Sequence, residues 1–350
     1  MNVAIIGYSS SGKSTLYRAA GGGSGDLTAV PVPDPRFDRI VAQVQPKKIT
    51  PATVLLQDGL DPIKGDSSKM FSQRFLDQAR KCQVLLHVVR SFESPIAPFH
   101  AEIDPARDVQ AVDVELVLTD LQIVENRLER LTKSAASKNP GSPEYAELKF
   151  FEQLVGPLGE GTPIRNLEMN ETEQAALKNY QFLSAKPLVV AFNVSEEEAG
   201  SPSPKIARLI EELGKQGVAA FAVSAQLEEE LAQLSPEEQP AFLADLGIEQ
   251  PASAKLIQAV YEALGLITFY TAGENETRAW PLRRGSSALK AAGTIHNDIA
   301  KGFIRAEVVS YEDYDEAGSL DTAYSAGKMR LEGKEYVVQE GDLLHIRNKS

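Results

Sequence analysis

The chain has 350 residues, a length that suits two or three domains. Its hydrophobic content of 43% and charged content of 24% are those of a globular protein, and we expect no membrane span. The net charge of −13 argues against a protein that coats DNA or RNA. The first residues lack the basic region of a signal peptide, and the single cysteine, Cys82, is typical of a reducing cytoplasm.

Buried strands alternate with helices in the first part of the chain. Asn2–Ile6 is an apolar, β-branched run that predicts a strand, and the helix that follows is expected from Ser14 to Ala20. The prolines at 31, 33 and 35 favour an extended segment. Further strands are predicted at 53–57, 84–89, 188–192 and 219–223, and a helix at 71–81. This alternation predicts an α/β fold with a doubly wound, mostly parallel sheet.

A helical pattern interrupts this alternation. Apolar residues spaced by three and four positions predict a coiled-coil seam through Val114, Val117, Leu121, Val124, Leu128 and Leu131. The segment 138–143 breaks the seam, and a similar stripe resumes at Leu148, Phe151, Val155 and Leu158. We expect an inserted helical hairpin, which serves either for packing alone or as an arm that meets a partner.

The C-terminal segment has a different pattern of predicted strands and helices. Strands are predicted at 267–270, 277–282, 303–309, 336–338 and 343–346, with a helix at 287–295. Several strands around one helix predict a small β-grasp-like domain. The predicted domains are therefore a phosphate-loop domain (1–112 and 183–265), a helical arm (113–182) and the β-grasp-like domain (266–350).

The segment Gly7–Ser14 has the glycine, lysine and hydroxyl spacing of a phosphate-binding loop. Its glycines let backbone N–H groups converge on a phosphate, and the following helix adds its positive N-terminal end. We expect Lys13 to reach the β- and γ-phosphates and the Ser14 hydroxyl to hold Mg²⁺. The nucleotide-binding residues predicted in this loop are Ser9, Ser10, Ser11, Gly12, Lys13, Ser14 and Thr15.

Residues after later strands extend the predicted site. Asp58 follows a predicted strand at the position that holds Mg²⁺ in phosphate-loop enzymes, so Ser14 and Asp58 are the predicted metal ligands. An aspartate at a strand end also serves as a helix or turn cap, which is the alternative for Asp58.

Two short segments are predicted to meet the base. Asn193, Val194 and Glu196 stand where G-proteins place the motif Asn-Lys-x-Asp, whose carboxylate binds the guanine N–H groups. Val194 and Glu196 replace its lysine and aspartate, which weakens the expected preference for guanine. Ser224 and Ala225, after the next strand, match the loop that also lies against the base.

The chain resembles the YchF-type Obg-like ATPases along its whole length. The segments that carry the resemblance are 30–36, 46–54, 87–90, 103–108, 193–196, 266–274, 278–280, 291–296, 302–308 and 341–342. The resemblance implies a G domain, an inserted helical arm and a C-terminal TGS domain of β-grasp type. It also implies ATP hydrolysis in preference to GTP hydrolysis, Mg²⁺ as cofactor and association with ribosomes.

Several positions depart from that family's pattern. Ser10 and Ser11 replace the asparagine and valine that are usual in its phosphate loop, and Gly21–Thr28 is a shortened first switch. Asp61 replaces the glycine of the Asp-x-x-Gly motif, and a glycine-rich second switch is missing around 66–72. A carboxylate close to the γ-phosphate would repel it by on the order of 1 kcal/mol.

Three hypotheses follow. The first is a cytoplasmic ATPase that regulates translation on the ribosome, in which no residue stands out as a general base and hydrolysis depends on positioning. The second is a nucleotide-sensing module with little or no hydrolysis, because both switches have changed. The third and weakest is a GTPase. No membrane or DNA partner is expected.

Overall fold

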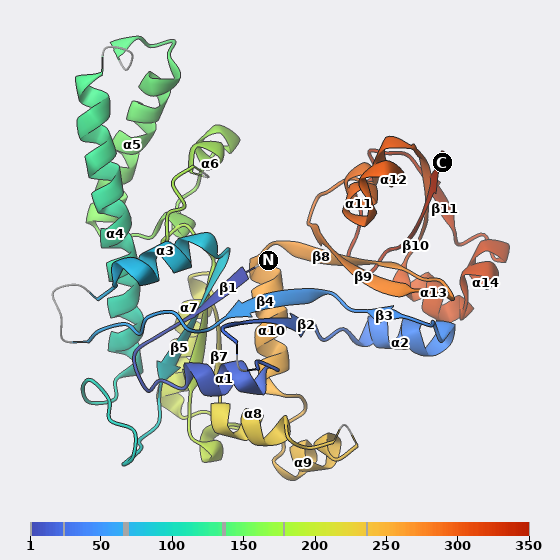
Figure 1. The fold of residues 1–350 in the computed structure, drawn as a ribbon, viewed down its shortest axis with the longest axis horizontal. Coiled ribbons are helices and arrows are strands. Elements are labelled where there is room, and N and C mark those ends of the chain that lie inside the picture. The colour runs from blue at the N-terminus through green and yellow to red at the C-terminus, as the bar shows by residue number, and fades with distance from the viewer. Residues whose placement is uncertain are drawn as a thin grey trace. The chain divides into compact units, whose positions relative to one another are not determined.

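The computed structural model describes residues 2–23, 25–65, 70–134, 138–177, 179–235 and 237–349 (Figure 1). The chain forms two compact units, of which the first comprises Met1–Thr28 and Leu55–Leu256. The second comprises Ala29–Val54 and Ile257–Ser350. The chain therefore passes three times between the units. No described helix has the length and apolar character that a membrane crossing requires.

The first sheet has six strands among the described residues, in the order β2-β4-β1-β5-β6-β7. Its strands are β1 (Asn2–Ile6), β2 (Leu27–Pro31), β4 (Thr53–Gln57), β5 (Val84–Arg90), β6 (Leu188–Asn193) and β7 (Ala219–Val223). Strand β1 pairs in parallel with β4 and β5, and the pairs β5–β6 and β6–β7 are parallel as well. The predicted doubly wound, mostly parallel sheet is thus confirmed.

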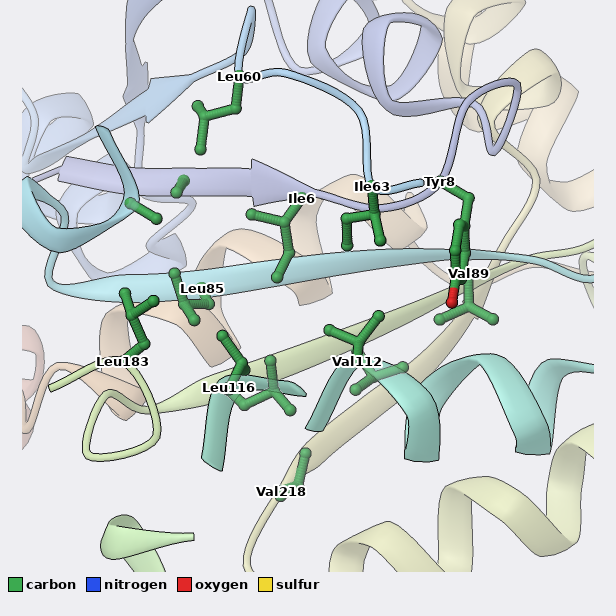
Figure 2. Packing of buried hydrophobic residues seen from close by; sticks show 14 of the residues in the cluster. Ile6, Tyr8, Leu60, Ile63, Leu85, Val89, Val112, Leu116, Leu183 and Val218 are labelled. Carbon is green, nitrogen blue, oxygen red and sulfur yellow. The ribbon is translucent and has the colours of Figure 1, made fainter. Parts of the chain in front are cut away.

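Helices connect these parallel strands, as such a topology requires. The helices of the first unit are α1 (Lys13–Ala19), α3 (Gln73–Lys81), α4 (Pro105–Lys133), α5 (Pro143–Gly159), α6 (Glu171–Leu177), α7 (Pro204–Lys215), α8 (Ala225–Leu231) and α9 (Gln239–Asp245), with single 3-10 turns at Ile164–Asn166 and Glu196–Glu198; α8 and α9 follow the last strand of the sheet, β7. Helix α10 (Ala252–Ala263) leads into the second unit. One face of the sheet, with Ile6, Leu85 and Val89, packs on Val112 and Leu116 of α4 in a continuous apolar core (Figure 2).

Helices α4 and α5 form the predicted hairpin. Val117 and Val124 of α4 are fully buried against Phe151 and Leu158 of α5. Val114, which the seam included, is 39% exposed and lies outside this core. Helix α4 begins at Pro105, so it crosses the predicted boundary at 113. The boundaries of the three predicted domains otherwise stay a prediction.

The second sheet, with the strand order β11-β10-β12-β8-β9-β3, has the mixed pairing of a β-grasp-like fold. Its elements are α2 (Pro35–Val44), β3 (Ile49–Thr50), β8 (Leu266–Thr271), β9 (Thr277–Arg283), α11 (Ala288–Ile295), α12 (Asn297–Lys301), β10 (Phe303–Val309), α13 (Tyr311–Ala317), α14 (Leu320–Ser325), β11 (Arg330–Glu332) and β12 (Leu343–Asn348). The strand expected at 336–338 is wrong, since only an isolated bridge joins Val337 to Ser287.

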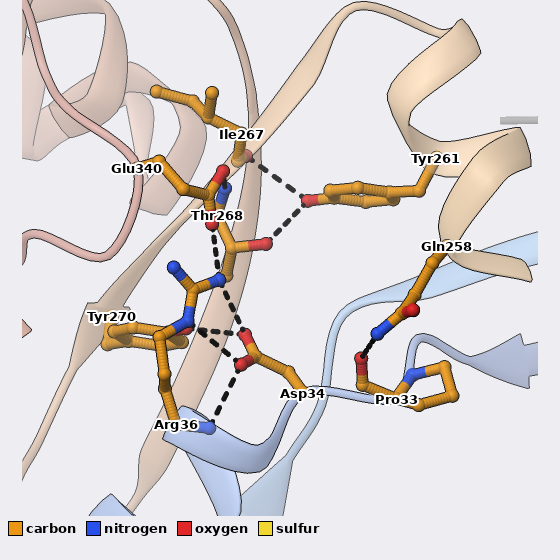
Figure 3. A network of polar contacts seen from close by, with 9 residues as sticks. All are labelled: Pro33, Asp34, Arg36, Gln258, Tyr261, Ile267, Thr268, Tyr270 and Glu340. Carbon is orange, nitrogen blue, oxygen red and sulfur yellow. Dashed lines mark hydrogen bonds and ion pairs between the residues drawn. The ribbon is translucent and has the colours of Figure 1, made fainter. Parts of the chain in front are cut away.

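Residues 29–54 belong to this second unit, which the sequence did not suggest. Strand β3 adds to the sheet in parallel with β9, and Phe37 of α2 stacks on Tyr270 at 6.0 Å between ring centroids. Asp34 accepts hydrogen bonds from the Tyr270 hydroxyl and from Arg36, while Arg36 also pairs with Glu340 at 2.5 Å (Figure 3). Burial and the Asp34 carboxylate raise the pKa of Tyr270, so its hydroxyl stays a donor. This network fixes the start of α2 to β8.

Candidate functional site

The loop between β1 and α1 adopts a conformation that its glycines make possible. Gly12 has φ +95°, and a Cβ atom there would overlap the Asn193 side-chain nitrogen. Gly7 has φ +150°, and a Cβ atom there would press on the Val88 carbonyl oxygen. Both glycines therefore allow close approach of the loop to neighbouring strands, and Ser10 takes a positive φ of 58° between them.

Lys13 lies at the first position of α1 and turns back over the loop. Its ammonium group donates to the carbonyl oxygens of Gly7 at 3.1 Å and Tyr8 at 2.6 Å. Burial lowers the pKa of Lys13 to about 8, although the Asp58 carboxylate acts in the opposite direction. At pH 7 the side chain still carries its charge, which the arrangement makes available to a phosphate group.

Arg90, at the end of β5, supports the other side of the loop. It is only 2% exposed and donates to the carbonyl oxygens of Ser10 at 3.2 Å and Ala97 at 2.8 Å. Its guanidinium also lies over the Phe92 ring at 4.6 Å. Burial lowers the pKa of Arg90. The loop backbone is thus fixed by a buried charge that the sequence analysis did not assign to the site.

Asn193 joins the loop to the predicted base-binding segment. Its amide nitrogen donates to the Ser11 carbonyl oxygen at 2.9 Å, and its amide oxygen accepts from the Ala225 N–H at 3.0 Å. The side chain is buried, and Ser224 caps α8 through the N–H of Leu227. Asn193 therefore positions the two segments relative to each other, since both ends of its amide bind the protein.

A cavity of about 730 Å³ opens beside this junction. Of the predicted residues, those that line it are Gly12, Thr15, Asn193, Val194, Glu196, Ser224 and Ala225. The other predicted loop residues, Ser9, Ser10, Ser11, Lys13 and Ser14, do not line the cavity but belong to the adjoining loop. The lining residues that were not predicted are Phe92, Glu93, Ser195, Glu197, Gln226, Glu229, Glu230 and Gln233.

Except for Ser195, which stands inside the Asn193–Glu196 segment, the missed residues lacked a sequence signal because they belong to no motif. Glu229, on α8, forms an ion pair with Arg18 of α1 at 2.6 Å, so its charge is already balanced. Phe92 lies two residues after the end of β5, and only the position of that strand end beside the loop could have indicated it.

Oxygen groups that could hold a divalent cation belong to the phosphate loop and to the segment after β4. Among the described residues the Ser14 hydroxyl has no hydrogen-bond partner. The Asp58 carboxylate is close enough to Lys13 to favour its charged form, although burial has the larger effect on the pKa of Lys13. Asp26, which the sequence analysis did not single out, accepts from the Asp58 N–H at 2.9 Å through its carbonyl oxygen, and its carboxylate packs on Gly59. A hydroxyl and carboxylates suit Mg²⁺. No cluster of three or more metal-binding side chains occurs in the described ranges.

Asp61 is held by the start of α3. Its carboxylate accepts from the Ser72 hydroxyl at 2.5 Å and lies 3.8 Å from the Arg74 guanidinium. Ser72 in turn caps α3 by accepting from the Phe75 N–H. These contacts give Asp61 a structural role near the second switch, of which residues 66–69 lie outside the described part.

Comparisons with known proteins identify the family to which this chain is similar. A family profile described as YchF-GTPase_C, Protein of unknown function (DUF933), matches residues 266–349. The Ribosome-binding ATPase YchF of Bacillus subtilis is 37% identical over 99% of each chain, and that of Haemophilus influenzae is 38% identical over 98% of each. The chain belongs to the YchF-type Obg-like ATPase family.

A solved structure supports the same assignment at the level of the fold. The structure titled Schizosaccharomyces pombe YchF GTPase matches with a TM-score of 0.89 and 29% identity, over 99% of this chain and 97% of that one. The phosphate loop and the C-terminal β-grasp-like unit expected of a YchF-type protein are therefore both present.

An aromatic cluster beside the phosphate loop is a further feature of this YchF-type chain that the sequence analysis did not predict. Tyr8 of the loop stacks on His100 at 4.0 Å between ring centroids, and Phe99 meets Tyr8 edge-on at 6.0 Å. Burial and the Asp108 carboxylate raise the pKa of Tyr8 to about 12, so its phenol stays protonated. The cluster covers the loop on the side of α4, where Asp108 lies.

Proposed function

We propose that this chain binds ATP with Mg²⁺, hydrolyses it and acts as a regulator that associates with ribosomes. The observation that carries the proposal is the Asn193 amide, which joins the phosphate loop to the Ala225 N–H at the edge of one cavity. This link through the Asn193 side chain, called the Asn193 brace below, suits a ligand that extends from the loop to the base-binding segment, as a nucleoside triphosphate does. The names of the relatives supply the ribosome and the preference for ATP.

Each group at the site has a proposed role. The backbone N–H groups of Ser9–Ser14 and the Lys13 ammonium bind the phosphates. The Ser14 hydroxyl and the Asp58 carboxylate hold Mg²⁺, which neutralises charge on the phosphate oxygens when it is bound. Val194, Glu196, Ser224 and Ala225 contact the base. We assign no general base, so hydrolysis depends on how the loop positions the γ-phosphate.

The choice between ATP and GTP depends on the base end. Val194 and Glu196 differ from the G-protein motif and both line the cavity. Both polar atoms of the Asn193 amide already bind the protein. The Glu196 carboxylate is therefore the group of this motif that we propose contacts the base. We propose a preference for adenine. A GTPase, as one solved relative is titled, is the alternative.

Single-turnover hydrolysis with Mg²⁺ tests the proposal. Enzyme in excess over radiolabelled ATP should release phosphate, and Lys13→Ala should abolish the release. Tight ATP binding with no phosphate release would instead support a nucleotide-sensing module, the alternative that the altered switches favour. Co-sedimentation with purified 70S ribosomes tests the ribosome association separately, since it does not require hydrolysis.

The proposed compartment is the cytoplasm. The single cysteine, Cys82, is buried and free in the described structure, which suits a reducing environment.

A further inference from the structure

Strand β12 in the second unit extends beyond its neighbour β8. Among the described residues the two strands share one partner pair, Leu343 with Tyr270, and β8 ends at Thr271. On its other side β12 pairs with β10 along its whole length, up to Asn348. Among the described residues, one edge of β12 therefore has no neighbouring strand from His345 to Asn348.

The backbone groups on this open edge can be identified from the strand's alternation. The Lys349 N–H donates to Gly302 on the β10 side, whereas the Asp342 carbonyl oxygen accepts from Tyr270 on the β8 side. Because N–H and C=O groups change sides at every residue, those of Ile346 and Asn348 point to the open edge. An open strand edge is a template for pairing with another chain.

A groove of about 590 Å³ lies along this edge. Ile295 and Ile299, from α11 and α12, belong to the same core as Ile346 and line one part of it. Leu320 and Tyr324 of α14 line another part, and Tyr324 is 65% exposed. Figure 1 draws α11 and α12 on one side of β10 and α14 on the other. An added strand would thus meet apolar side chains on both of its faces.

The charges in the groove distinguish between possible partners. His345 contacts the buried Glu307 carboxylate at 2.6 Å, and Arg347 pairs with the same group. The pairing with Glu307 balances the charge of Arg347 and leaves little attraction for phosphates. Asp321 also lines the groove, and its carboxylate has no ion-pair partner among the described residues. A basic side chain therefore fits better than a nucleic acid backbone.

We propose that the open edge of β12 binds an extended segment of a ribosomal protein as an additional strand. The segment would pair with the backbone of Ile346 and Asn348, place apolar side chains alternately against Ile299 and Tyr324, and present a basic residue to Asp321. This inference rests on the proposed association with ribosomes and names the surface that provides it.

Hydrogen exchange of the intact wild-type chain tests the proposal directly. The probe is purified Bacillus subtilis 70S ribosomes, and the readout is amide exchange in the fragment 343–349. We expect exchange at Ile346 and Asn348 to slow about tenfold or more in the complex. Protein-free ribosomal RNA from the same ribosomes should leave this exchange unchanged, and equal protection by that RNA would overturn the protein partner.

Two variants make the same test by co-sedimentation. Asn348→Pro removes an N–H group on the open edge and leaves the hydrogen bonds between β12 and β10 in place. Tyr324→Ala removes an exposed aromatic side chain that lines the groove. Each should weaken ribosome binding about tenfold, while the control Leu331→Ala, at a 61% exposed position outside the groove, should not.

The possible failures differ from one another. If the wild type does not sediment with ribosomes, the proposed ribosome association is wrong, and the groove proposal with it. If the wild type sediments while both variants bind equally well and the exchange is unchanged, only the groove proposal is wrong. Should a variant fold poorly by circular dichroism, the exchange experiment on the wild type decides alone.

Discussion

The two parts of the nucleotide site are constructed differently. At the loop and the base-binding segment, buried side chains from separate strands bind the loop backbone, as Asn193 does at Ser11 and Arg90 does at Ser10. At the switch segments the polar side chains bind their own neighbourhood instead, as Asp61 does at Ser72 and Thr28 does at Gly21. The comparison teaches that side chains from separate strands hold the proposed binding site together, while the predicted switch segments are held only by local contacts.

The largest expected effect comes from the charge in the rigid part. Lys13→Ala removes the ammonium group that we propose binds the phosphates, and charged hydrogen bonds contribute about 1.5–3 kcal/mol. We expect ATP affinity to fall about 100-fold, measured by isothermal titration calorimetry. Lys215→Ala, at an exposed lysine of the same unit, is the matched control. Unchanged affinity in Lys13→Ala would remove the phosphate loop from the account.

Asn193→Ala tests whether the brace itself matters. The change leaves the Ser11 carbonyl and the Ala225 N–H without their partner, at a cost of about 1–3 kcal/mol of stability. Since the loop and the base-binding segment then move independently, ATP affinity should drop about tenfold. Urea denaturation and titration calorimetry measure the two effects. Asn275→Ala, at an exposed position, should change neither. A stable variant with wild-type affinity would contradict the role of the brace.

The core beneath the loop predicts a dependence on pH. Burial, with the nearby Lys13 charge, lowers the pKa of His87 to about 3, so the folded chain holds it neutral. The unfolded chain takes up a proton near pH 6.5, and the free energy of unfolding should therefore fall below that pH by up to about 1.4 kcal/mol per unit.

His87→Leu isolates this contribution. Asp120 has the opposite sign, because burial raises its pKa to about 6 and its stabilising effect grows as the pH falls. Because Asp120 is present in both proteins, its contribution cancels in the difference between the free energies of unfolding of wild type and His87→Leu. Urea denaturation at pH 7, 6 and 5 should give a difference that shifts with pH, and a constant difference would show that folded His87 takes up its proton over the same pH range as the unfolded chain.

Asp61→Asn has the smallest expected effect and sharpens the comparison at the switch. Because the carboxylate caps α3 through Ser72, we expect a loss of about 0.5–1 kcal/mol in stability and little change in the ratio of ATP to ADP affinity. A carboxylate that faced the γ-phosphate would act differently. Its removal would raise ATP affinity about tenfold over ADP.

Local pattern predicted much of the fold. The continuous apolar run Asn2–Ile6 and the periodic seam through Val117 and Val124 are local patterns, and the strand and the helix predicted from them are confirmed. Residues 29–54 were missed because their place in the second unit depends on long-range contacts, such as that of Asp34 with Tyr270. The strand expected at 336–338 failed because Val337 forms only a single bridge.

The site residues likewise divide into those of a contiguous motif, which were predicted, and those that the fold brings together, which were not. The phosphate loop is a contiguous motif, and the residues predicted from it lie together with Asn193 and Ala225. Arg90, Phe92 and Asp26 were not predicted because each acts through spatial proximity to the loop, which no spacing along the chain encodes. The role of Asp61 likewise depends on Ser72, which lies eleven residues further along the chain.

Equilibrium binding of ATP, GTP and ADP to the wild-type chain, measured side by side with Mg²⁺, tests the central claim most directly. The account predicts that ATP binds more tightly than GTP, and that ATP and ADP both compete for one site that Lys13→Ala weakens. A clear preference for GTP would contradict the interpretation of Val194 and Glu196, and the absence of binding by all three nucleotides would contradict the account as a whole.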